Sequence, residues 1–153
     1  MTTVPKVLLG VGGCVVLLGV LAIGGTWWLW ARWHSLMESG TAARSQGEHE
    51  GAGLDEARCL AATLDRLRPD PQMSFSDSHY EYQRLDGCLA RSRLSKSFCE
   101  GAPGSGKIIP WAAARCRALD FQRPDCTPFL QLVAKYCSSP ERREKEQQAG
   151  GSN

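Results

Sequence analysis

The sequence lacks the patterns that mark a reactive or metal-binding site. No two cysteines form a C-x-x-C pair, and the three histidines, His34, His49 and His79, are not at ligand spacing from any cysteine, which argues against a zinc site. Ser-His-Asp, paired-carboxylate and haem-attachment signatures are also missing. These absences predict a protein that is not an enzyme and holds no metal and no cofactor.

An excess of basic side chains is missing as well. The chain has 18 Lys and Arg against 16 Asp and Glu, and two of the basic residues, Lys6 and Arg32, precede residue 34. The charges beyond that point therefore balance. A nucleic-acid-binding face needs a net positive charge to displace counterions, so we expect no nucleic-acid partner.

Charge is absent from one long stretch near the N-terminus. Residues 7–30 contain no Asp, Glu, Lys or Arg, and a helix of this length reaches the roughly 30 Å of a bilayer core. The stretch predicts a transmembrane anchor in a lipid bilayer, preceded by a short cytoplasmic N-terminus at residues 1–6. Tryptophans gather at its far boundary, as in a membrane-interface belt. They are Trp27, Trp28, Trp30 and Trp33.

Two processing alternatives compete with an uncleaved anchor. Cys14 follows Val11-Gly12-Gly13 as in a lipoprotein signal, although the apolar stretch before it is short. Cleavage after Gly24 fits the small-residue rule and would remove residues 1–24. We expect the uncleaved form, because the apolar run continues into the tryptophans. Cys14 is then a small apolar residue in lipid.

The remaining cysteines indicate the compartment. Six of the seven lie beyond the anchor: Cys59, Cys88, Cys99, Cys116, Cys126 and Cys137. An even set in a short domain behind an export-like segment predicts three disulfides. We therefore expect the C-terminal part in an oxidising extracytoplasmic space (periplasm, lumen, intermembrane space or cell surface).

Composition divides the exported part into three. Residues 31–53 are rich in Gly, Ser, Ala and charged side chains and predict a juxtamembrane belt and a flexible spacer. Residues 54–139 predict one cysteine-rich helical domain, and residues 140–153 predict a disordered tail whose first half can alternatively extend a helix. Because strand-like alternation is absent, the predicted fold class is all-α, with a transmembrane helix and a disulfide-rich bundle of about four helices.

The first helix of this bundle is predicted at 55–67 and ends before Pro69. Its apolar residues recur at helical spacing and predict the core-facing stripe. They are Ala57, Leu60, Ala61, Leu64 and Leu67.

The other three helices are predicted from caps and prolines. The second begins at a capping box of Ser78 and Glu81 and reaches about residue 98. The third begins at Pro110 and ends at Arg123, and the fourth is capped by Thr127. The expected core residues of the third and fourth helices are Trp111, Ala112, Ala118, Leu119, Cys126, Phe129, Leu130, Val133, Tyr136 and Cys137.

Helix geometry restricts the disulfide pairing. Cys59 and Cys88 are nearly equidistant from the Pro69–Pro71 turn, which favours their pairing in a hairpin. Cys126 and Cys137 would be ~16 Å apart on one helix, whereas a disulfide needs Cα atoms within ~7 Å. Two arrangements then remain: Cys99–Cys126 with Cys116–Cys137, or Cys99–Cys137 with Cys116–Cys126. Cys59 lies off the predicted stripe, so either its bond staples the flank of the hairpin or the helix phase is wrong.

One motif resembles a catalytic one. Gly101–Lys107 matches the first seven positions of the P-loop of P-loop NTPases, but Ile108 stands where Ser or Thr would hold magnesium. No buried strand precedes it, so we expect an inter-helix loop and no nucleotide. His79 lies between Asp77 and Glu81, a grouping that helix capping explains better than acid–base chemistry.

The sequence favours a role in binding. Tyr80 and Tyr82 lie on different sides of their predicted helix, which makes Tyr80 a candidate for protein contact. The expected function is a single-pass, membrane-anchored extracytoplasmic interaction module that serves as an accessory or assembly subunit and binds an unidentified membrane or extracytoplasmic protein. The alternatives are a signal-cleaved soluble binding protein, such as an inhibitor or ligand carrier, and a thiol-redox enzyme.

Overall fold

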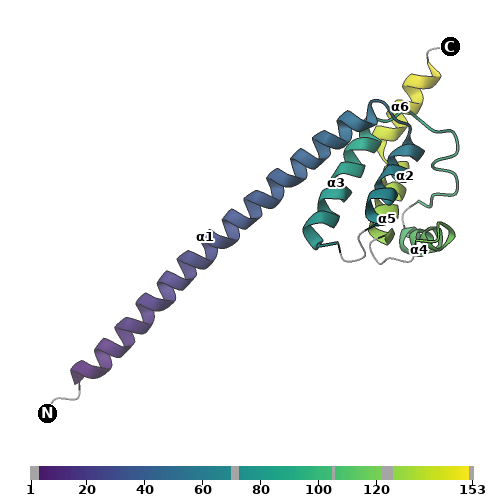
Figure 1. The fold of residues 1–153 in the computed structure, drawn as a ribbon. Coiled ribbons are helices and arrows are strands. Elements are labelled where there is room, and N and C mark those ends of the chain that lie inside the picture. The colour runs from purple at the N-terminus through teal and green to yellow at the C-terminus, as the bar shows by residue number, and fades with distance from the viewer. Residues whose placement is uncertain (1–3, 70–72, 105, 122–125, 152–153) are drawn as a thin grey trace. The chain divides into compact units, whose positions relative to one another are not determined.

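A computed structural model describes residues 4–69, 73–104, 106–121 and 126–151, and the side chains of these residues except 4–22, 35 and 36. Within these ranges the protein has six helices and no strand, which confirms the all-α prediction (Figure 1). The helices are α1 (Val4–Gly51), α2 (Glu56–Leu67), α3 (Phe75–Arg91), α4 (Ile108–Ala118), α5 (Cys126–Cys137) and α6 (Pro140–Gly150). The chain divides into two compact units, residues 1–38 and 39–153.

The predicted anchor at residues 7–30 belongs to the first unit. Its backbone is part of α1, but the side chains of residues 7–22 lie outside the described set. Among the residues that are described, no helix combines the length and the apolar character needed to cross a membrane.

The second unit begins with the C-terminal part of α1, where a flexible spacer was predicted. Helix α1 continues through Gly51, and its last turns pack against α3. Arg84 Nε donates to Glu50 Oε1 at 3.0 Å, and Arg44 pairs with Asp86. Within the spacer predicted at 31–53, residues 39–51 are therefore helical and packed instead of flexible, because tertiary packing overrides the weak helix propensity of glycine.

Glycines allow α1 and α3 to come into backbone contact. A Cβ on Gly47 would overlap the carbonyl oxygen of Arg84, and one on Gly87 would overlap that of Arg44. Gly47 and Gly87 thus face the opposite helix at the points of closest approach. Gly87 lowers the helix propensity of α3, but its lack of a side chain lets α1 pack closely against this helix.

We expect Gly47→Ala to separate α1 from α3. An added methyl group in a filled contact costs about 1–3 kcal/mol, which exceeds the gain of about 1 kcal/mol in helix propensity. Gly40→Ala is the matched control on the same helix, because its Cβ would lie 3.5 Å from His79 Nε2, an ordinary contact. Peptide-resolved amide hydrogen exchange should show faster exchange in 41–51 and α3 for Gly47→Ala only. Equal exchange in the two variants would contradict the close approach.

Helix α2 begins and ends where it was predicted. The side chain of Asp55 caps it by accepting a hydrogen bond from the Arg58 amide, and the helix ends at Leu67, before Pro69. Its buried face differs in part from the prediction: Leu64 and Leu67 of the predicted stripe are buried, but so are Cys59 and Thr63, which lie off it. Cys59 is therefore in the core, and its bond to Cys88 of α3, with Cα atoms 5.8 Å apart, confirms the favoured pairing.

Helix α3 starts earlier and ends earlier than predicted. The Ser74 side chain accepts from the Asp77 amide at 3.2 Å, so the cap is Ser74 and not Ser78. The helix ends at Arg91 because Arg93 then donates its backbone N–H to Leu54 O at 2.9 Å, at the entrance to α2. Glu81 has no capping role and instead accepts from Arg66 Nε of α2 at 2.7 Å. This ion pair joins α2 and α3, which lie side by side (Figure 1).

Helices α4 and α5 form the second pair. Helix α4 begins at Ile108, two residues before the predicted Pro110, and ends at Ala118, where the chain turns through Asp120 at a φ of 51°. The predicted end at Arg123 lies outside the described residues. Only two of its residues, Ala112 and Cys116, are buried, so the expectation that Ala118 and Leu119 are core residues was wrong.

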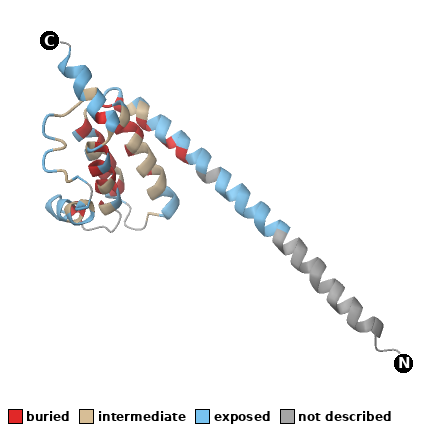
Figure 2. Cartoon of the chain, turned by 180° about the vertical axis from the view of Figure 1, so that it is seen from behind, coloured by how far each residue is buried: buried red, intermediate tan, exposed pale blue. Residues whose placement is uncertain are grey.

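Helix α5 supplies the centre of the core. Thr127 lies inside this helix, which begins at Cys126, and so it is not the predicted cap. The predicted apolar face is buried except for Cys137, which is half-buried, and Figure 2 shows the buried residues gathered inside the bundle. Cys116 bonds to Cys126, and Cys99 bonds to Cys137. Of the two remaining arrangements, the structure therefore has the one that joins α4 to the start of α5.

Helix α6 occupies the region predicted to be a disordered tail. Ser139 caps it, and Arg142 reaches back to Glu56 at the start of α2, with Nε and Oε1 2.9 Å apart. Both side chains are buried, and Glu56 is fully so. Lys145 donates to Leu89 O at 2.7 Å and to Ser92 O at 3.1 Å. Polar contacts of Arg142 and Lys145 with residues far away in the sequence thus order this segment. Because the segment lacks apolar residues, its sequence did not indicate that it folds.

Burial also shifts the pKa of ionisable side chains near the Glu56–Arg142 ion pair. It raises the pKa of the Tyr136 phenol above its ordinary value, and the nearby Glu56 adds to this shift. It lowers the pKa of the Lys145 ammonium. Lys145 Nζ of α6 also lies 3.2 Å from the Tyr136 hydroxyl of α5. Helix α6 therefore packs on α5 through this lysine and the buried phenol.

Candidate binding groove

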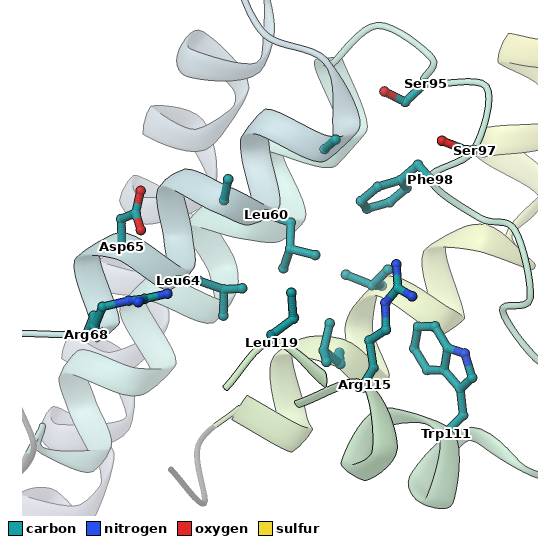
Figure 3. A pocket seen from close by; sticks show the side chains of 14 residues that line it. Leu60, Leu64, Asp65, Arg68, Ser95, Ser97, Phe98, Trp111, Arg115 and Leu119 are labelled. Atoms are coloured by element: carbon teal, nitrogen blue, oxygen red, sulfur yellow. The ribbon is translucent and has the colours of Figure 1, made fainter. Parts of the chain in front are cut away.

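A groove of about 340 Å³ lies between α2 and α4. Its floor is formed by Leu130 and Val133 of α5. One wall is the row Ala57, Leu60, Ala61 and Leu64 on α2, which continues to Asp65 and Arg68. The opposite wall is Trp111 and Arg115 of α4 with Leu119 directly after it, and Ser95, Ser97 and Phe98 close one end (Figure 3).

The α2 wall of the groove explains why the core stripe was misplaced. Of the predicted stripe, Leu64 and Leu67 are buried in the core, but Ala57 and Ala61 are exposed and Leu60 is only half-buried. The rest of the core side is the adjacent face with Cys59. Helix α2 therefore has a second apolar face beside the buried one, which lines the groove, and Leu64 contributes to both. The off-stripe position of Cys59 was the signal in the sequence that two such faces exist.

The α4 wall presents large side chains that the core does not cover. Trp111 is half-buried, and Leu119 is 38 % exposed. Both sit one helical turn from Arg115, and Figure 3 shows Trp111 and Arg115 next to each other on the same side of α4. Apolar surface of this kind gains free energy when a partner covers it, at roughly 25 cal/mol per Å².

Charge is unevenly placed around the groove. The Arg68 guanidinium lies 5.9 Å from the centre of the Phe121 ring, in a cation–π contact, and Asp65 precedes it by three residues on α2. Figure 3 shows both at the end away from Phe98. Arg115 is exposed, and among the described residues its side chain has neither a hydrogen bond nor an ion pair. It is therefore the cation that the groove offers to a bound group.

The end wall at residues 95–98 is held from two sides. The Ser95 amide donates to Glu56 Oε2 at 2.9 Å, so the buried ion pair of α2 and α6 also fixes this segment. One residue after Phe98, Cys99 is bonded to Cys137 at the end of α5. The groove is thus built on rigid contacts, although the segment itself is not helical.

The other predicted site residues do not meet at the groove. Trp27, Trp28, Trp30 and Trp33 lie in the first unit and are all more than half exposed. Tyr80 is half-buried and donates to Gln46 on α1, so part of this side chain contacts its own chain, and its contact with another protein stays a prediction.

Two further sequence features have local explanations in the structure. Residues 101–104 and 106–107 of the P-loop-like motif lie in the connection between α3 and α4, with positive φ at Gly101 and Gly106. His79 stacks on Phe75, with ring centres 6.5 Å apart. In the described part of the chain, no group of three or more His, Cys, Asp or Glu side chains is placed to hold a metal ion.

Comparison of the chain with protein-family models, with curated proteins and with solved structures finds no match. The lining residues of the groove offer apolar contact, two serine hydroxyls and charge. Such a surface is suited to holding another molecule.

Proposed function

We propose that the protein is a non-enzymatic, membrane-anchored interaction module that binds another membrane or extracytoplasmic protein through this groove. The second apolar face of α2 carries the proposal, because a helix that is already anchored in the core has no structural need for it. Contiguous exposed apolar surface on a small domain marks an interaction site. The half-buried Trp111 and the exposed Leu119 extend this surface across the groove.

The anchoring part of the proposal rests on the uncharged stretch at residues 7–30. Tryptophans at its end support an interfacial belt, and Trp27 and Trp30 form a ring pair with centres 5.8 Å apart. The three disulfides support an oxidising compartment for the bundle. The proposed membrane anchor, the disulfide-bonded bundle and the groove together support an accessory or assembly role.

A photo-crosslinking residue at Ala61 should capture the partner in native membranes. Ala61 is exposed and points into the groove wall, so a benzoylphenylalanine there leaves the core intact. We expect one dominant crosslinked protein, and we expect Ala57→Glu to abolish it by placing a charge against the apolar contact. The matched control is benzoylphenylalanine at Ala114, which is exposed on α4 and outside the lining. Equal capture from both positions, or from neither, would contradict binding through the groove.

A further inference from the structure

We infer that the groove takes an amphipathic helix of the partner, with apolar side chains one turn apart and an Asp or Glu that pairs with Arg115. This inference rests on the proposed function and specifies the chemistry of the bound segment. It draws on the spacing of the two walls, on the kind of backbone that lines them and on the charge that they present.

The shape of the groove favours a helix. On α2 the row Ala57, Leu60, Ala61 and Leu64 follows helical spacing, and the two alanines let a neighbouring backbone come close. The row of Trp111 and Arg115 on α4 and Leu119 directly after it recurs every fourth residue and lines the same groove (Figure 3). Figure 1 shows α4 nearly end-on beside α2, so the two rows cross. A third helix laid along the α2 row packs ridges into grooves at the usual spacing of ~8–10 Å, with the α4 row meeting its flank.

The backbone of the walls disfavours an extended segment. A bound strand gains its affinity from main-chain hydrogen bonds to a sheet edge. The two long walls are α2 and α4, whose backbone groups bond within their own helices, and the described ranges contain no strand. Side-chain packing is therefore the available mode of recognition, as for helices in hydrophobic grooves.

The charge of the groove selects an acidic segment. Its lining has one acidic residue, Asp65, and two basic ones, Arg68 and Arg115. Asp65 and Arg68 are three residues apart on α2 and offset each other, which leaves Arg115 as the net charge. Helix α4 has no acidic residue at all. A guanidinium beside an apolar wall accepts a carboxylate in two parallel hydrogen bonds, so an Asp or Glu next to the apolar anchors fits this position.

The inference is tested with the full chain in native membranes, carrying benzoylphenylalanine at Ala61. Mass spectrometry identifies the crosslinked peptide of the partner. We expect an apolar helical sequence with an Asp or Glu within one turn of the crosslinked residue. Arg115→Gln should reduce the crosslinking yield about three- to tenfold. Arg117→Gln, which removes the same charge from an exposed position outside the lining, should leave the yield unchanged.

Charge reversal completes the test. Arg115→Glu should abolish capture, and replacing the partner's acidic residue by Lys should restore it. Unchanged amide hydrogen exchange in α4 and α5 confirms that the Arg115 variants fold. If crosslinking at Ala61 persists but responds alike to the substitutions at 115 and 117, or maps to a segment without Asp or Glu, the acidic helix is wrong while binding through the groove stands. If Ala61 captures nothing, both proposals are wrong.

Discussion

Reduction of the three disulfides is expected to unfold residues 54–139. The bridges close loops with sequence separations of 29, 38 and 10 residues. On the chain-entropy estimate the two longer loops contribute about 3.5–4 kcal/mol each and the shortest about 2.5–3 kcal/mol. Their combined loss is comparable to the whole stability of a small domain, about 5–15 kcal/mol. In excess reductant, amide hydrogen exchange in α2, α3 and α5 should rise to the rate of an unfolded chain.

The individual bridges give the internal comparison for this prediction. Replacing Cys116 and Cys126 together by Ala removes the shortest loop and should be the mildest of the three double substitutions. Replacing Cys59 and Cys88 should cost more, because that bond closes a longer loop. Slow exchange in α2 and α5 after complete reduction, verified by thiol counting, would show that the apolar core suffices alone.

Arg142→Ala is expected to destabilise the domain by about 3–5 kcal/mol. It leaves the Glu56 carboxylate fully buried without its ionic partner, and an uncompensated buried charge is far more costly than a surface charge. The substitution should also loosen the 95–98 segment, since the same carboxylate accepts from the Ser95 amide. Urea titration of amide hydrogen exchange in α2, α5 and α6 measures the loss.

The double variant separates the buried charge from simple loss of packing. Because Glu56 and Arg142 interact, Glu56→Gln with Arg142→Ala should cost clearly less than the sum of the two single substitutions. Arg143→Ala is the matched control, since Arg143 is the exposed neighbour on α6. Additive costs, or an equal effect at Arg143, would show that the pair contributes little.

Much of the fold follows from local rules that the sequence displays. Asp55 and Pro69 define both ends of α2 because capping and proline geometry act within a few residues. The Cys59–Cys88 pairing follows from the position of the turn. The predicted cap of α3, Ser78, was wrong by one helical turn, because Ser74 caps the helix in the packed structure.

The rest depends on contacts between distant residues, which no local pattern encodes. Arg142 and Glu56 are 86 residues apart, so the polar segment at 140–150 gives no sign that it folds. Gly47 and Gly87 indicate flexibility when considered separately, but they form one close contact between two helices. The groove could not be predicted, because helical periodicity identifies an apolar stripe but does not show whether the stripe packs in the protein's own core or lines a binding surface.

The bridge beside Phe98 sets an order of events in the maturation of this protein. A newly made chain with free thiols lacks the tether that holds the end wall of the groove against α5. On the proposed function, the groove therefore binds its partner only after Cys99 and Cys137 have been oxidised. Assembly before oxidation is then avoided without any additional regulator.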